Sequence, residues 1–158
     1  MNVISPFRAD LRLIVKATWP DVTNPTFRMT QIQRRNWVNE IGSGKLTAPY
    51  CVIEMPPPTN AAGWSPSAVT YLATPTVYYI AAEKDGGGDI GALIEQRLSA
   101  LTDALLFGGF PYTVTEEPTT DTSASQAVND SMLAAEMPYL SGALTFGALI
   151  GYVRVYTG

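Results

Sequence analysis

Apolar side chains near the start of the chain recur at helical spacing. Phe7, Leu11 and Ile14 lie at i, i+4 and i+7, which places them on one face of a helix. Ser5-Pro6 suits a helix start, because serine caps free N–H groups and proline fits the first helical position. Trp19-Pro20 ends the pattern, since the residue before a proline avoids the α region. The pattern predicts a helix over residues 5–18.

A longer amphipathic stretch lies in the second half of the chain. Asp89 is a good N-cap, and Gly108-Gly109 is a typical helix end. Between them one face is apolar, and its members are Ile90, Leu93, Ile94, Leu98, Leu101 and Leu105. The stretch predicts a helix over residues 90–107 that packs this stripe on a sheet.

The remaining apolar runs predict strands. They lie at residues 49–55, 69–82, 111–117 and 143–156. Pro56-Pro57-Pro58 ends the first run, and Pro75 either bends the second or places it at a sheet edge. A polar loop is expected at residues 119–125, and a short helical turn within residues 126–137.

Consecutive strands with few helices are typical of an α+β fold. We expect one domain spanning residues 1–158, with a mostly antiparallel sheet of four to five strands and an N-terminal helix and one long helix packed on it. Residues 20–47 fit this pattern poorly. They alternate weakly over residues 26–32 and contain a glycine-rich turn, so we expect an extended arm or hairpin there.

Charge is scarce and unevenly distributed. Hydrophobic residues make up 46% of the chain and charged residues 15%, against a usual share of about 25%, which favours a surface that is partly interface. Residues 1–50 carry seven bases and three acids (+4), whereas residues 51–158 carry three bases and eleven acids (−8). The alternatives are a compact monomer with solvated loops of both signs, or a subunit whose basic side meets the acidic side of a neighbour.

Two clusters are the candidates for such a subunit interface. The basic and aromatic cluster consists of Arg34, Arg35 and Trp37. The acidic cluster consists of Glu116, Glu117 and Asp121, which would otherwise face a DNA-filled lumen. At a sequence pI of about 4.7, sequence-specific DNA binding is not expected.

Catalytic chemistry has little support in the residue types. The chain has no histidine, and its one cysteine, Cys51, lies in an apolar run typical of a buried strand. We therefore expect no catalytic residues, no metal site and no cofactor. No apolar run approaches the roughly 20 residues that cross a membrane, and no signal peptide is expected.

One glycine pattern suggests a nucleotide site. Gly86, Gly88 and Gly91 match G-x-G-x-x-G between an expected strand and an expected helix. Asp89, however, places a carboxylate where a pyrophosphate would lie at the helix N-terminus. A small nucleotide-binding enzyme therefore stays a distant alternative.

The order and spacing of several segments resemble the tail terminator (tail completion) proteins of tailed bacteriophages. The segments are the helix ending at Thr18-Trp19-Pro20, the strands at residues 49–53 and 77–81, the helix at residues 89–107, and residues 136–146 leading into the last strand. The resemblance covers most of the chain, but not residues 21–47 or 59–68, and it contains no diagnostic motif.

The resemblance implies a structural virion protein rather than an enzyme. Its subunits would form a ring, usually a homohexamer, at the top of the tail tube, where it ends tube growth and joins the tail to the neck. The implied partners are other copies of the chain, the tail tube protein and a neck or stopper protein. Genomic DNA would pass through the lumen without sequence-specific binding. The expected location is the virion, with the host cytoplasm during assembly. A stopper or tail tube subunit is the nearest alternative.

Overall fold

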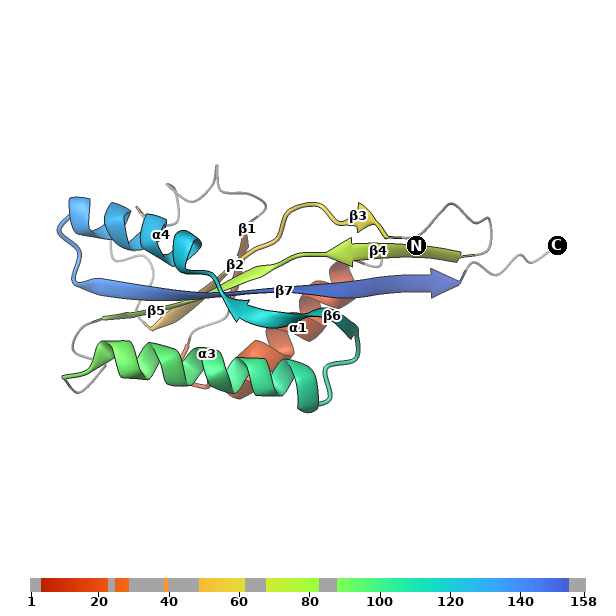
Figure 1. The fold of residues 1–158 in the computed structure, drawn as a ribbon, viewed down its shortest axis with the longest axis horizontal. Helices are drawn as coiled ribbons and strands as arrows, with labels where there is room; N and C mark the ends of the chain where they lie inside the picture. The colour runs from red at the N-terminus through yellow and green to blue at the C-terminus, as the bar shows by residue number, and fades with distance from the viewer. Residues whose placement is uncertain are drawn as a thin grey trace.

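The described part of the chain forms three helices and seven strands (Figure 1). The computed structural model describes residues 4–22, 25–28, 39, 49–61, 68–82 and 88–153. The elements in chain order are α1 (Ile4–Thr18), β1 (Thr26–Arg28), β2 (Tyr50–Glu54), β3 (Thr59–Asn60), β4 (Ala68–Ala73), β5 (Thr76–Ala82), α3 (Ile90–Phe107), β6 (Thr113–Thr120), α4 (Thr122–Ala134) and β7 (Tyr139–Val153). The α+β class expected from the sequence is confirmed.

The strands form one mixed sheet in the order β1-β2-β5-β7-β4-β3, with β6 paired to β7. Only the β1–β2 pair is parallel among the described pairs. The sequence analysis therefore predicted too few strands, four to five instead of seven, and did not predict the parallel pair. The extra strands are short: β1 has three residues and β3 has two, too few for a visible alternation.

β4 and β5 are two halves of one bent strand along β7. Ala73 pairs with Ala148 and Thr76 with Thr145, so the two halves follow each other along the same edge of β7. Pro75 lies in the break, and its carbonyl accepts a hydrogen bond from the Phe146 N–H at 3.4 Å. Of the two alternatives for Pro75, the bend is the one found, since β4 and β5 both have strand neighbours.

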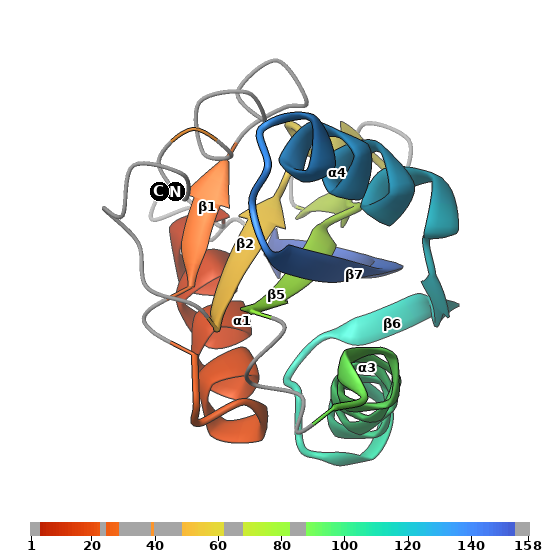
Figure 2. The ribbon, with the colours of Figure 1, turned by 90° about the vertical axis from the view of Figure 1, so that its left-hand side faces the viewer.

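α1 and α3 cover one face of the sheet (Figure 2). The predicted stripe of α3 is buried there at Ile94, Leu98, Leu101 and Leu105. Phe7, Leu11 and Val15 of α1 are buried with it. Both helices begin and end within a residue of the predicted bounds. In each of them the residues that start and stop the helix enclose the same stretch as the apolar stripe.

α4 covers the opposite face (Figure 2). The sequence predicted a polar loop and a short helical turn here, and the structure shows a helix of 13 residues. Its only buried side chains are Val128 and Met132, too few to produce an apolar stripe in the sequence. The helix depends on its cap and on packing against the sheet rather than on its own periodicity. The last strand also begins earlier than expected, at Tyr139.

Candidate interaction surface

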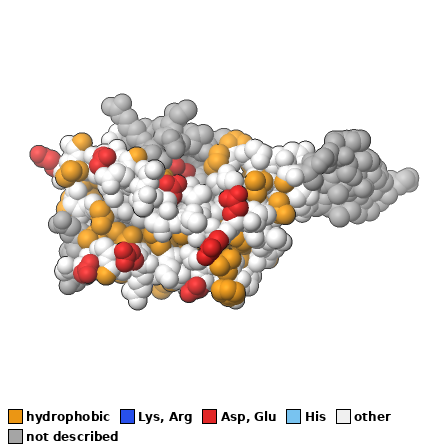
Figure 3. Space-filling model, viewed as in Figure 1, with side chains coloured by type: hydrophobic (Ala, Val, Ile, Leu, Met, Phe, Trp, Pro, Cys, Tyr) orange, Lys and Arg blue, Asp and Glu red, His pale blue; other side chains and the backbone are white. Residues whose placement is uncertain are grey.

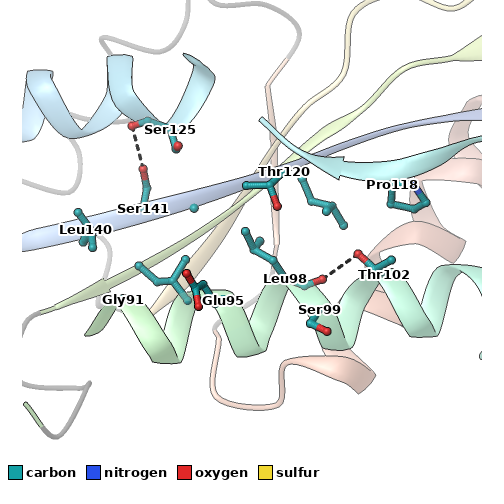
Figure 4. Close-up of a pocket in the computed structure, with 13 residues that line it drawn as sticks. Gly91, Glu95, Leu98, Ser99, Thr102, Pro118, Thr120, Ser125, Leu140 and Ser141 are labelled. Carbon is teal, nitrogen blue, oxygen red and sulfur yellow. Dashed lines mark hydrogen bonds between the residues drawn. The ribbon is translucent and has the colours of Figure 1, made fainter. Parts of the chain in front are cut away.

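A groove of about 500 Å³ lies between α3, β6 and the start of α4 (Figure 4). Its apolar lining comes from Ile94 and Leu98 of α3 and from Leu140 and Leu144 of β7. Glu95, Ser99 and Thr102 line it from α3, and Pro118 and Thr120 from β6. Ser125 of α4 and Ser141 of β7 complete the polar part of the lining. The groove thus combines apolar side chains with several polar groups, which suits a binding surface.

β6 pairs with β7 only over residues 144–149, so the first residues of β7 have no β6 neighbour. The groove lies beside this unpaired part of β7. The last β6 pairing is Thr120 with Leu144, and the chain then turns at Asp121 into α4. A side chain of α4 occupies part of the vacated edge. Asn129 accepts a hydrogen bond from the Ser141 N–H at 2.8 Å and donates one to the Ser141 carbonyl at 3.4 Å. Asn129 thereby takes the place of a neighbouring strand and protects the edge from unwanted pairing.

Gly142 allows α3 to lie close to β7 at the base of the groove. A Cβ at this position would collide with the Ile94 side chain and would lie 3.0 Å from Leu98 Cδ1. The absence of a side chain therefore fixes how deeply α3 packs on β7. Sequence reasoning did not identify Gly142, although a glycine within a strand often marks such an approach.

The surface around the groove is acidic. Residues 88–153 carry eight acids and one base, a balance of −7. The base, Arg97, pairs with Asp21 at 3.2 Å, next to the Tyr79 hydroxyl. Figure 3 shows red and orange side chains on this face, and no blue ones among the described residues. Apart from Arg97, which is paired with Asp21, the charged residues within residues 88–153 are all acidic.

The predicted acidic residues lie beside this groove. Glu116 and Glu117 are exposed on β6, where the pairing with β7 is irregular. Asp121 has a structural role: its carboxylate caps α4 by accepting from the Ala124 N–H at 3.0 Å and also accepts from the Thr145 hydroxyl at 3.2 Å. The basic cluster of Arg34, Arg35 and Trp37 lies outside the described residues.

A cationic stripe that the sequence analysis missed lies on α1. Arg8, Arg12 and Lys16 are spaced at i, i+4 and i+8, and this spacing was the signal that could have found them. The guanidinium groups of Arg8 and Arg12 lie 5.4 and 5.1 Å from the Phe27 ring centroid of β1. β1 lies at one edge of the sheet and β6 at the other (Figure 2). The cationic stripe, which contacts Phe27 of β1, and the groove, which β6 lines, therefore lie near opposite edges.

The residues considered for chemistry have structural roles where they are described. Asp89 caps α3 by accepting from the Ala92 N–H at 3.0 Å, and Gly88 adopts a φ of 100° just before it. Gly86 lies outside the described residues. Burial raises the pKa of the Cys51 thiol. Burial, followed by the hydrogen bond to Asp21, raises the pKa of Tyr79 to about 12.

Within the described ranges, no three acidic, histidine or cysteine side chains come together as metal ligands. No helix in this part of the chain has the length and apolar character to span a bilayer. No protein-family model matches the chain, and no curated protein sequence matches it.

Proposed function

We propose that this protein is a structural virion protein that forms a ring at the top of a phage tail tube, with six copies as the resemblance implies. The observation that carries the proposal is the placement of opposite charges at the two edges of one sheet. A ring needs a heterologous interface, in which one patch meets a different patch of the next copy. Complementary charge on the two patches favours that register.

The composition supports an assembly role as well. A charged share of 15% leaves much of the surface uncharged, and Leu13 and Phe107 are 68% and 84% exposed. Exposed apolar side chains next to charged ones are typical of interfaces between subunits. In the proposed role the ring ends tube growth and joins the tail to the neck, and DNA passes through its centre.

The decisive measurement is the mass and shape of the purified assembly. Light scattering should give a multiple of the 17.0 kDa chain mass, six-fold for a hexamer, and electron micrographs should show closed rings. Immunogold labelling of virions should place the protein between tail and head. Open tubes in the micrographs would favour a tail tube subunit, and label on the capsid side of the neck would favour a stopper. A monomer at every concentration, with no label on virions, would overturn the proposal.

The basic cluster outside the described residues gives a second test. Reversing both Arg34 and Arg35 to glutamate should weaken assembly while the circular dichroism spectrum stays unchanged. The difference from the wild type should shrink in high salt, because exposed charge pairs are screened within about 8 Å at physiological ionic strength. Unchanged assembly of the double variant would remove these arginines from the interface.

A further inference from the structure

The groove beside β6 offers a binding site, and α1 near the opposite edge of the sheet presents an exposed leucine next to cations. We infer that the outer face of α1 of one copy docks in this groove of the next copy, with Leu13 as the apolar anchor. The inference rests on the proposed ring, and it names which surfaces meet.

The groove requires an occupant with an apolar side chain and positive charge. Ile94, Leu98, Leu140 and Leu144 offer an apolar lining, and Glu95 is the one ionisable residue among the described residues that line the groove. The surrounding α3, β6 and α4 are acidic, and their one base is already paired with Asp21. A neutral apolar segment would leave this negative charge uncompensated, so a partner that combines both features is favoured.

The outer face of α1 combines those features. Leu13 is 68% exposed, and the exposed residues one turn away on either side, Ala9 and Ala17, are small enough to let another surface approach. Arg12, also exposed, is adjacent to Leu13, and Lys16 lies on the following turn. Grooves commonly bind a helix through its exposed apolar side chains. On α1 the side chain that can serve in this way is Leu13, with the cations beside it.

The other large exposed apolar side chains of the described residues lie on the groove side of the molecule, so they cannot reach the groove from the opposite edge of the sheet. Leu106 and Phe107 end α3, and Leu133 is on α4, so all three belong to the helices that flank the groove. Leu13 is on α1, whose Arg8 and Arg12 lie over Phe27 of β1 at the far edge of the sheet. A contact from that edge to the groove runs head to tail, which is the arrangement that closes a ring.

Cysteine cross-linking tests the contact directly, because the chain contains a single buried cysteine. Cys51 is buried and its thiol pKa is raised, so it should stay inert in the folded protein. The double variant Leu13→Cys/Ser99→Cys places one thiol on α1 and one on the exposed α3 wall of the groove. On mild oxidation it should give a ladder of disulfide-linked multimers on a non-reducing gel.

The matched control is Leu133→Cys/Ser99→Cys, since Leu133 is similarly exposed at 75%. It should give no ladder. Intact rings by light scattering without a Leu13–Ser99 ladder would overturn the α1 contact and leave the proposed ring standing. A ladder from open chains rather than rings would support the contact and overturn the ring. An equally strong ladder from the control would also overturn the contact, because it would show unspecific collision.

A charge exchange provides a readout that does not depend on thiols. Glu95→Arg should weaken association about 10-fold, because it places like charges at the docked interface. Arg12→Glu added to the same chain should restore most of that loss. A double variant that is weaker than Glu95→Arg alone would show that the two side chains do not meet. Asp103→Arg, on the same helix but outside the groove lining, is the control and should have little effect.

Discussion

The face of the sheet under α1 and α3 and the face under α4 are buried by different means. The first rests on a large apolar cluster that includes Leu98, Leu101 and Tyr79. The second has a small cluster, to which α4 contributes the buried Val128 and Met132 and the partly buried Ala124. Polar bonds supplement it, since Asn129 and Asp121 bond to β7. One sheet can thus be covered by a helix with a broad apolar stripe on one face and by a helix held by a few specific bonds on the other.

The difference in burial also decides which helix is visible in the sequence. A stripe of leucines is a periodic signal, whereas two apolar residues and an asparagine are not. The α4 face should therefore lose less stability on truncation of an apolar side chain and should respond more to the loss of a polar one. Four substitutions test this contrast.

The largest effect is expected at Leu98. Leu98→Ala should lower the free energy of unfolding by about 2–5 kcal/mol, because it opens a cavity between α3 and the sheet. Urea denaturation of the purified protein measures the change. Leu106→Ala, on the same helix but 39% exposed, is the control and should cost much less. A loss below about 0.5 kcal/mol at Leu98 would contradict the role given to this stripe.

Met132→Ala should cost about 2 kcal/mol, at the lower end of the range for buried methionine. Its side chain is fully buried, but it packs in the small cluster, where α4 can move to close the cavity. The neighbouring Leu133→Ala, at a site 75% exposed, should leave the urea midpoint nearly unchanged. A greater loss at Met132 than at Leu98 would reverse the ranking of the two faces.

Asn129→Ala should cost about 1–3 kcal/mol, since it leaves the partly buried Ser141 N–H without its acceptor. The Ser141 hydroxyl, which donates to Asn129 Oδ1 at 2.8 Å, loses the same partner. Asn129→Asp keeps the acceptor atoms and should retain part of the stability. Faster amide hydrogen exchange at Ser141 in Asn129→Ala is the local readout. Unchanged exchange would show that Asn129 does not protect this edge.

The smallest effect is expected at the helix caps. Asp121→Ala should cost about 1 kcal/mol through the lost N-cap of α4. Asp89→Ala removes the equivalent cap of α3, but α3 is held by its buried stripe and Asp89 is exposed. We therefore expect a smaller change in the urea midpoint for Asp89→Ala. Equal losses would indicate that α4 depends on its cap no more than α3 does.

The continuous apolar runs of β2 and β5 indicate that both faces of the sheet are covered. All five residues of β2 are buried, and six of the seven in β5. A strand with one solvated face alternates, whereas a strand covered on both faces is apolar throughout. Tyr50-Cys51-Val52-Ile53 thus predicts a layer on each side of the sheet, and a helix opposite α1 and α3 follows from it.

The sequence specifies α1, α3 and the buried strands, because their caps, prolines and apolar periodicity are local properties of the chain. It also determined the charge imbalance between the two halves. Where that imbalance lies in space depends on the tertiary structure. The pairing of Thr120 with Leu144 ends β6 and opens the groove, and the β1–β2 pairing places the cations of α1 at the far edge. Both depend on contacts between residues distant in sequence, whose pairing no local pattern specifies.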